Sequence, residues 1–271
     1  MGLVYAIANQ KGGVGKTTTV VNLAAYFGAR GKRVLCIDID PQGNTTTGLG
    51  IKKRSLTASS YHVLNGSAKI ADVIQQTEYE NVSIVPARDE LAGCELELSQ
   101  MEYRAIRLRM QLLICKADYD YIFIDCPPAL GLLTLNGLAA ADEIIVPMTA
   151  EFYALEGLSQ LMTTMKAVRA NLNPSLKIAG ILFVMFDPRL NVSRQVEEEV
   201  AKYFPNQIFR TKIPRNVRLS EAPSYGKPVM YYDKNSKGAE AYAELGMELL
   251  GETPPPKEKK RFQLFHRKNK N

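Results

Sequence analysis

The feature that most constrains this chain is a glycine-rich tract near its start, Ala8-Asn9-Gln10-Lys11-Gly12-Gly13-Val14-Gly15-Lys16-Thr17-Thr18-Thr19. Its Gly15-Lys16-Thr17 ending fits the phosphate-binding pattern G-x-x-x-x-G-K-[ST]. The fit is incomplete, because the chain has Gln10 where the pattern has its first glycine. A second lysine, Lys11, stands at the front of the tract.

The flanks of the tract decide how it is interpreted. Residues 4–8 form a short apolar run that predicts a buried strand, and residues 18–28 carry apolar side chains at helical spacing. On its own the tract could be a loop whose glycines only supply turns. Between a strand and a helix, it directs bare backbone N–H groups and the positive end of the helix dipole at one small volume. We therefore predict a nucleotide site formed by residues 11–18, namely Lys11, Gly12, Gly13, Val14, Gly15, Lys16, Thr17 and Thr18.

Length and composition favour an ordinary globular protein. The chain has 271 residues, of which 46% are hydrophobic and 23% charged. No apolar run approaches the roughly 18 residues of a membrane span, and the start lacks the layout of a signal peptide. The four cysteines form no C-x-x-C pair, and we expect them to be reduced core residues.

The net charge of +6 is concentrated at the end of the chain. From Glu252 onward there are seven basic and two acidic residues, a charge of +5, which leaves about +1 for the body. Pro254-Pro255-Pro256 marks a boundary, so we predict one domain over residues 1–251 and a basic tail over 252–271. We expect the tail to be disordered, with a nucleic-acid arm as the alternative. Its apolar residues, Phe262, Leu264 and Phe265, are too few for stable membrane binding.

Two predicted strands end in carboxylates. Residues 33–40 end in Asp38 and Asp40, and residues 121–125 end in Asp125 before Pro127. Acids at the carboxyl ends of parallel strands lie where open α/β sheets bind ligands. Asp125 is typical of a Walker B carboxylate on Mg²⁺, and Asp38 or Asp40 could position the ion or the attacking water.

The rest of the chain alternates strand and helix patterns. We predict further strands at 82–86, 143–147 and 178–185. We predict helices at 91–115 (one or two), 132–141, 154–171, 192–204 and 239–250. This alternation predicts the α/β class: a single, doubly wound, mostly parallel sheet with helices on both faces. Residues 45–80 are polar and mixed, with short helical pieces such as 71–75, and we expect a surface excursion there.

Residues 208–228 hold five basic side chains and one acidic one. Such a segment could form a patch for a phosphate backbone, or it could be a solvated face, and the spacing alone leaves both open. Asp187-Pro188-Arg189 adds another arginine after a predicted strand.

Four motifs in this order resemble the ParA/MinD group of deviant-Walker-A ATPases, and closely the Soj-type ParA partitioning ATPases. They are residues 11–18, 38–44, 124–128 and 213–223, and the resemblance covers about residues 3–250. It implies a P-loop NTPase fold with ATP and Mg²⁺ as cofactors. Because the chain starts just before the first strand, we expect no N-terminal helix-turn-helix extension of the larger plasmid ParA type.

The resemblance also implies catalytic roles. Lys11 matches the lysine that reaches the nucleotide of a partner subunit in a sandwich dimer, and Lys16 matches the ordinary P-loop lysine on the β- and γ-phosphates. Thr17 and Asp125 match Mg²⁺ ligands, and Asp40 matches the acid that positions the water.

Further positions match contacts to the base, the ribose and DNA. Pro214 and Asn216 match adenine contacts, and Glu151 resembles a ribose contact made across the dimer. Arg189 and Arg218 match residues used for non-specific DNA binding, and the loop that holds Arg215 and Arg218 favours DNA. The predicted contacts to base, ribose and DNA are therefore Glu151, Arg189, Pro214, Arg215, Asn216 and Arg218. They imply a cytoplasmic, nucleoid-associated ATPase, released from DNA when a ParB-like partner stimulates hydrolysis.

Three other functions are open to such a chain. A MinD-like, membrane-cycling division regulator would need a stronger amphipathic tail. An electron-transfer ATPase resembling the nitrogenase iron protein would use Cys94 and Cys126, but prolines follow Cys126 where similar proteins have glycines. A non-catalytic DNA-binding module would leave Lys16 and Asp40 without a role.

Overall fold

A computed structural model of the protein describes residues 2–253. Its strands form one eight-stranded sheet in the order β3-β4-β2-β5-β1-β6-β7-β8. They are β1 (Leu3–Ile7), β2 (Val34–Asp38), β3 (Gln75–Gln76), β4 (Val82–Val85), β5 (Tyr121–Asp125), β6 (Glu143–Thr149), β7 (Lys177–Phe186) and β8 (Ile213–Pro214). Neighbouring strands run parallel except β3 with β4, so the predicted mostly parallel sheet is confirmed.

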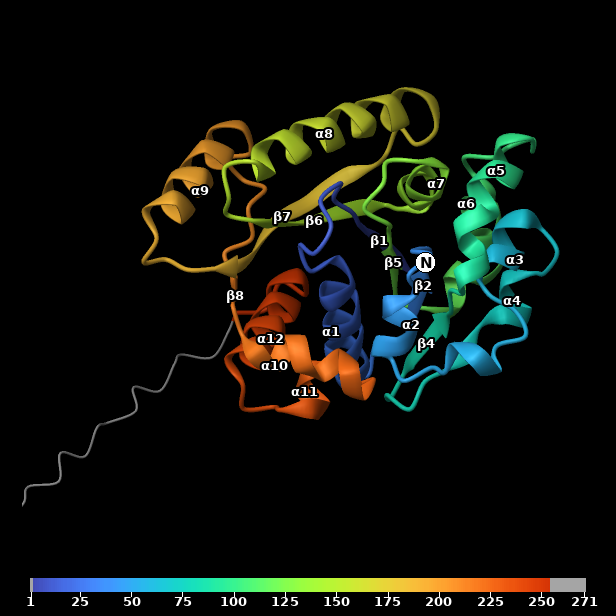
Figure 1. The fold of residues 1–271 in the computed structure, drawn as a ribbon, viewed down its shortest axis with the longest axis horizontal. Helices are drawn as coiled ribbons and strands as arrows, with labels where there is room; N and C mark the ends of the chain where they lie inside the picture. Colours follow the sequence, from blue (N-terminus) through green and yellow to red (C-terminus); the bar gives the residue numbers. More distant parts are fainter. Residues whose placement is uncertain (1, 254–271) are drawn as a thin grey trace, which may run out of the picture.

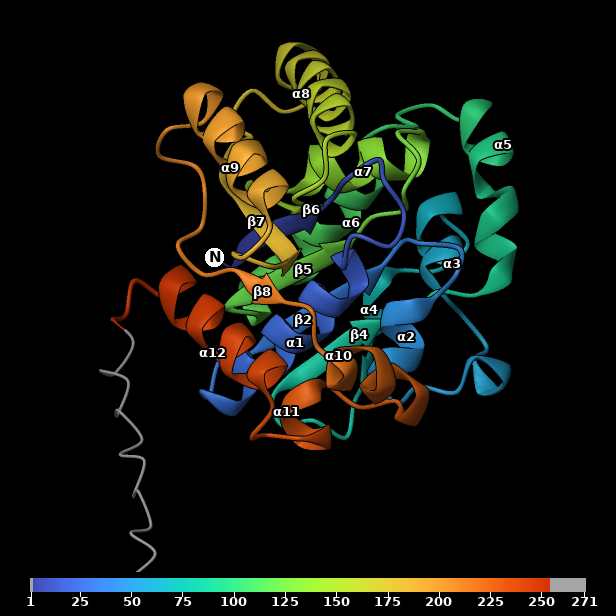
Figure 2. The same cartoon turned by 60° about the vertical axis from the view of Figure 1, so that its left-hand side comes forward.

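Helices cover both faces of the sheet, as Figures 1 and 2 show. One face carries α1 (Lys16–Ala29), α2 (Asn44–Gly48), α10 (Val217–Glu221), α11 (Val229–Tyr232) and α12 (Lys237–Leu249). The other carries α3 (Ser60–Asn65), α4 (Ile70–Val73), α5 (Cys94–Ser99), α6 (Arg107–Cys115), α7 (Leu132–Ala140), α8 (Ala154–Asn171) and α9 (Asn191–Tyr203). Among residues 2–253, no helix is long and apolar enough to cross a membrane.

The pleat of the central strand β1 explains why its sequence is apolar throughout. Val4 and Ala6 join the core under α3 to α9, while Tyr5 and Ile7 join the core under α1 and α12. A parallel strand covered on both faces cannot alternate apolar and polar residues. β1 lies between β5 and β6, where the direction of strand order reverses. Crevices at such switch points are where open α/β sheets bind ligands.

The prediction for residues 45–80 was wrong. Instead of an excursion over the surface, this segment contributes α2, α3, α4 and β3, and it buries Val63, Leu64, Ile70 and Val73 in the core. These elements are too short for their periodicity to stand out among polar residues. Two-residue strands are also too short to show a period, and neither β3 nor β8 was predicted.

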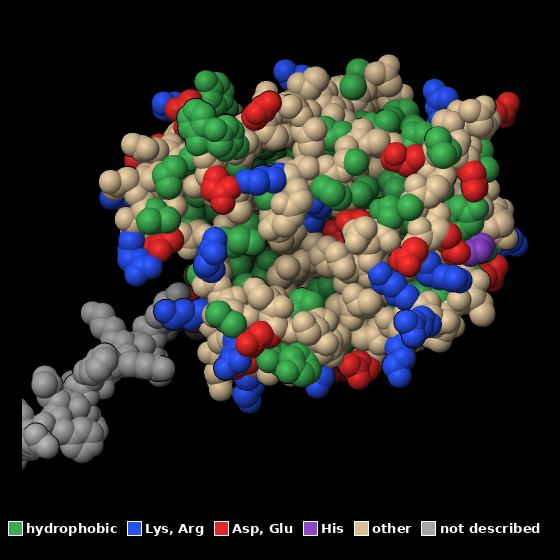
Figure 3. Space-filling view, viewed as in Figure 1, with side chains coloured by type: hydrophobic (Ala, Val, Ile, Leu, Met, Phe, Trp, Pro, Cys, Tyr) green, Lys and Arg blue, Asp and Glu red, His purple; other side chains and the backbone are tan. Residues whose placement is uncertain are grey.

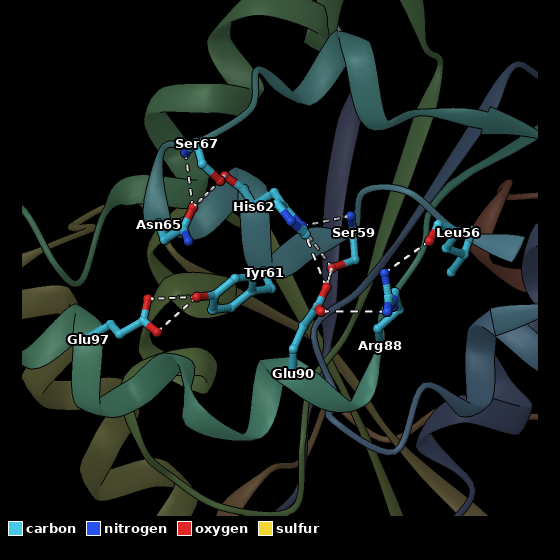
Figure 4. A network of polar contacts seen from close by, with 9 residues as sticks. All are labelled: Leu56, Ser59, Tyr61, His62, Asn65, Ser67, Arg88, Glu90 and Glu97. Carbon is cyan, nitrogen blue, oxygen red and sulfur yellow. Dashed lines mark hydrogen bonds and ion pairs between the residues drawn. The ribbon is translucent and has the colours of Figure 1, made fainter. Parts of the chain in front are cut away.

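A polar network fixes the segment to the chain near residue 90 (Figure 4). Ser59 Oγ donates to Glu90 Oε1 at 3.0 Å, and Tyr61 OH donates to Glu97 Oε1 at 2.8 Å. His62 Nδ1 accepts from Ser59 N at 3.2 Å and thereby caps α3. Hydrogen bonds between elements that are not adjacent in sequence are invisible to a pattern-based prediction.

The helices predicted over 91–115 are confirmed as α5 and α6, but their apolar faces are narrower than their composition suggests. Leu96 and Leu113 are exposed, whereas Cys94 and Leu98 point inward one turn apart. The basic tail lies outside the described residues, except for its first two positions.

Candidate nucleotide site

The glycine-rich loop joins β1 to α1 through two residues with left-handed backbone. Gly13 has φ 72° and Gly15 has φ 78°, values that residues with a Cβ rarely adopt. Gly15 directly precedes α1, so its conformation turns the chain into the helix. The N–H groups of the first helical turn have no partner within the helix and face the loop, as an anion site requires.

Asn9 anchors this loop to the sheet, and sequence reasoning missed it. Its Nδ2 donates to the Pro147 carbonyl at 2.7 Å, and its Oδ1 accepts from Lys11 N at 3.1 Å. One buried amide therefore connects the start of the loop to β6. A polar residue directly after an apolar strand was the only available signal.

Lys16 is buried beneath the loop. Only 6% of the residue is exposed, and its Nζ donates to the Lys11 carbonyl at 3.2 Å. Burial lowers the pKa of Lys16, while the nearby carboxylates of Asp125 and Asp40 act to raise it. A buried ammonium with one carbonyl partner is well placed to bind anionic phosphate oxygens.

Asp125 sits at the end of β5 with two threonine hydroxyls on one oxygen. Thr17 Oγ1 and Thr45 Oγ1 each donate to Asp125 Oδ2 at 2.7 Å. Its Oδ1 is buried and has no hydrogen-bond partner among the described residues. Burial raises the pKa of Asp125 to about 6, against the hydroxyl bonds that lower it. An unpartnered carboxylate oxygen beside a hydroxyl fits Mg²⁺, which prefers oxygen ligands. Thr45 was not predicted for this site.

Asp38 holds the loop after β2. Its Oδ2 accepts from Thr46 N at 2.8 Å and Thr46 Oγ1 at 2.7 Å, and its Oδ1 accepts from Asp40 N at 3.2 Å. Burial, and then the charge of Asp125, raise the pKa of Asp38 to about 7. Both oxygens accept hydrogen bonds, so in this structure Asp38 orders the loop that carries Asp40.

Asp40 lies at the turn itself. It is 7% exposed, and its Oδ1 accepts from Gln42 N at 3.0 Å. The charge of Asp40 raises the pKa of both Lys16 and Asp125, which indicates that the three side chains lie near one another. The structure therefore brings together Lys16, Thr17, Asp40 and Asp125 from the ends of three strands.

Lys11 lies on the outer side of the same loop. Its Nζ pairs with Glu151 Oε2 at 2.5 Å, and both side chains are about half exposed. The bond to Lys11 lowers the pKa of Glu151. The two residues expected to reach a second subunit are thus paired within one chain.

A pocket of about 450 Å³ opens beside Gly15 and Thr18. Pro214, Arg215 and Asn216 line it from the chain after β8. Met185, at the end of β7, also lines it with a φ of 52°, an uncommon conformation for a residue with a Cβ. Sequence reasoning missed Met185, since backbone strain leaves no sequence signal. The pocket joins the predicted base-binding residues to the phosphate loop.

The arginines lie after β7 and β8. Arg189 is highly exposed and pairs with Asp187 at 2.7 Å, and Arg218 pairs with Glu221 at 2.7 Å and Asp233 at 3.2 Å. The local charge is therefore smaller than the count of basic residues suggested. Because β7 and β8 are adjacent parallel strands, the segments after them start from the same edge of the sheet.

Known proteins resemble this chain in sequence. A protein-family model described as an AAA domain matches residues 2–178. The sporulation initiation inhibitor protein Soj of Bacillus subtilis is 53% identical, over 92% of this chain and 98% of Soj. The chromosome partitioning protein ParA of Myxococcus xanthus is 51% identical, over 96% of this chain and 92% of that protein. The chain belongs to the Soj/ParA family of chromosome-partitioning ATPases.

A solved structure has a similar fold. A Mycobacterium smegmatis protein named cobyrinic acid a,c-diamide synthase, solved with ADP and magnesium, superposes with a TM-score of 0.81. It is 38% identical, over 92% of this chain and 94% of that one. The relatives of the chain are chromosome-partitioning ATPases, which supports partitioning over a MinD-like role.

The cysteines of this Soj/ParA protein are free and buried, as expected from the sequence. Burial raises the pKa of the Cys94 thiol to about 12. Burial also raises the pKa of the Cys126 thiol. Iron–sulfur clusters are held by thiolates. Thiols that resist ionisation inside the core therefore lend no support to the electron-transfer alternative.

Proposed function

We propose that this protein is a DNA-partitioning switch whose ATP-bound sandwich dimer binds double-stranded DNA without sequence preference. One observation carries the proposal: a single loop holds Lys16 inside the site and Lys11 at its surface. The buried lysine serves its own nucleotide. The exposed one can serve a nucleotide only from outside, as in a dimer. We infer that residues 1–251 form the ATPase domain.

The hydrolytic step is phosphoryl transfer to water. The loop N–H groups and Lys16 bind the phosphates, and Thr17 and Asp125 would hold Mg²⁺, which neutralises phosphate charge when bound. Asp40 orients the water, and Asp38 fixes Asp40 through its backbone N–H. Lys11 of a second subunit adds positive charge as the transition state forms. Hydrolysis then depends on pairing.

The remaining predicted contacts follow from the pocket beside Gly15. Pro214 and Asn216 contact the adenine, because they line the volume into which a bound nucleotide extends from the loop. Glu151 contacts the ribose across the dimer. This requires that the Lys11–Glu151 pair separate, and an exposed pair costs only about 0–1 kcal/mol to break.

DNA binding would use Arg189, Arg215 and Arg218. All are exposed, and arginine binds phosphate oxygens in a bidentate manner. A ParB-like partner bound to DNA would stimulate hydrolysis and release the protein, which would then rebind elsewhere on the nucleoid.

The test is retention on DNA with ATP, with ADP and without nucleotide. We expect wild type and Asp40→Ala to be retained with ATP alone, because Asp40→Ala binds ATP without hydrolysing it. Lys16→Ala and Arg218→Glu should not be retained. Arg210→Glu is the matched control and should be retained with ATP, because Arg210, like Arg218, is exposed and paired with an acid but is not among the predicted DNA contacts. Retention that is the same in all three nucleotide states would refute the proposal.

A further inference from the structure

An apolar groove of about 490 Å³ lies between α8 and α9, and the nucleotide site uses none of its side chains. Figure 3 shows hydrophobic side chains, with acidic and basic ones beside them, where Figure 1 draws α9. The apolar lining is Leu155, Leu158 and Met162 from α8, and Val200, Tyr203 and Phe204 from the end of α9. Its volume falls within the roughly 300–1,000 Å³ of ligand pockets, enough for aromatic side chains.

The described chain ends within reach of this groove. Glu248, in the last turn of α12, accepts from Arg210 N at 2.8 Å and from Thr211 N at 2.9 Å. Arg210 is six residues beyond Phe204, which lines the groove, so at most about 20 Å of chain separates them. From residue 253 to Phe262 there are nine residues, which can span about 30 Å.

The chemistry of the C-terminal segment is complementary to the groove. Residues 257–271 place Phe262, Leu264 and Phe265 among seven basic residues and one acidic one. One acidic side chain lines the groove: Glu199, which also pairs with Lys202 at 2.6 Å. Glu156, next to Leu155 on α8, is exposed. Within residues 2–253, Glu156 makes no ion pair. The apolar lining therefore lies close to one acidic side chain, Glu156, that has no ion pair within the described residues.

A second exposed apolar surface fits this segment less well. On α6, Met110, Leu113 and Ile114 are 49%, 71% and 57% exposed. Arg107 and Arg109 lie on the same helix, so its charge has the same sign as the tail. Like charges oppose docking, whereas the carboxylates of the α8/α9 groove favour it.

We propose that residues 257–271 dock in the α8/α9 groove of their own chain, with Phe262, Leu264 and Phe265 against its apolar lining. The docked segment shields this apolar surface and holds its basic side chains at the rim. The proposal does not depend on DNA binding or on a dimer.

Paramagnetic NMR of the full chain tests the docking. All four native cysteines are buried, so Gln263→Cys gives one accessible thiol for a nitroxide label. We expect the methyl signals of Leu155, Leu158 and Met162 to lose intensity, and to recover when the nitroxide is reduced. Ser159→Arg, which adds positive charge in the groove, should restore most of that intensity. Thr163→Arg, exposed on α8 outside the groove, should not.

Three results would overturn the proposal. The first is equal methyl intensity with the oxidised and the reduced label. The second is loss of the Met110 methyl signal in place of the groove signals, which would assign the segment to α6. The third is broadening of the groove signals in isotope-labelled chains that carry no nitroxide, once they are mixed with spin-labelled chains. This result would show that the groove takes the segment of a second copy.

Discussion

Lys11 Nζ and Glu151 Oε2 lie 2.5 Å apart, although 140 positions separate the two residues in sequence. They follow β1 and β6, which are neighbours in the sheet. Both side chains are about half exposed, so the pair adds no more than about 1 kcal/mol to stability. The ion pair holds Lys11 at the exposed edge of the nucleotide site, and the protein does not need the pair in order to fold.

Lys11→Ala should therefore abolish most hydrolysis while the fold persists. Charges supplied in trans to phosphoryl transfer are worth about 10³–10⁵ in rate, so we expect a loss of about 10³-fold. The free energy of unfolding should change by less than about 1 kcal/mol. Arg30→Ala, which breaks an exposed pair with Glu252 at 2.8 Å, is the control and should keep wild-type turnover. Unchanged turnover in Lys11→Ala would remove this lysine from the mechanism.

Thr45→Val should raise the Mg²⁺ concentration that hydrolysis requires. The variant removes one of two hydroxyls that orient Asp125 Oδ2, and the loss of such supporting bonds costs about 10–100-fold in metal affinity or activity. A Mg²⁺ titration of ATP turnover measures the effect. Thr47→Val removes a hydroxyl that bonds only nearby carbonyls, and its titration should match wild type. If both variants titrate alike, Thr45 has no such role.

Gly15→Ala should destabilise the chain by about 1–2 kcal/mol, because a Cβ at φ 78° is strained. The added atom would also lie 3.8 Å from a Val184 methyl, an ordinary contact, so the backbone causes the loss. Chemical denaturation without nucleotide measures it. At Gly12, φ is not positive and a Cβ would meet open space, so Gly12→Ala should leave stability nearly unchanged. Equal losses in both variants would argue against backbone strain.

Asp125 makes the stability of the nucleotide-free protein depend on pH. Its pKa is about 6 in the fold against an ordinary 3.8, so the folded state holds this proton more tightly than the unfolded state. The group favours folding fully below about pH 4, and that contribution is lost as pH rises to about 6. Asp125→Asn should thus gain stability relative to wild type across this window.

Asp120→Asn provides a control of opposite sign for the same denaturation series. Hydrogen bonds from Arg33 lower the pKa of Asp120 to about 2, so its contribution is present above about pH 4 and lost as pH falls towards 2. Asp120→Asn should therefore lose stability relative to wild type as pH rises from 2 to 4. Parallel pH profiles for the two variants would contradict both assignments.

The features that could be predicted from the sequence are those that depend on residues close together in the chain. The β1–loop–α1 unit was predictable because an apolar run, glycines and a helical period occur in one stretch. Asp40 and Asp125 were predictable because each follows an apolar strand. Thr45 could not be found in this way: its partner Asp125 is 80 positions away, and only the pairing of β2 with β5 brings the two together.

The sequence by itself determined the phosphate loop, the parallel sheet and the strand ends that carry carboxylates, since glycine conformation and apolar periodicity act over a few residues. Only the tertiary structure decided how those ends are used. In the tertiary structure Lys16 is buried and Lys11 is about half exposed, and the oxygens of Asp38 accept hydrogen bonds from Asp40 and Thr46. Asp125 Oδ1 has no hydrogen-bond partner within residues 2–253. Burial and hydrogen-bond partners depend on which strands lie side by side, and local sequence does not encode that order.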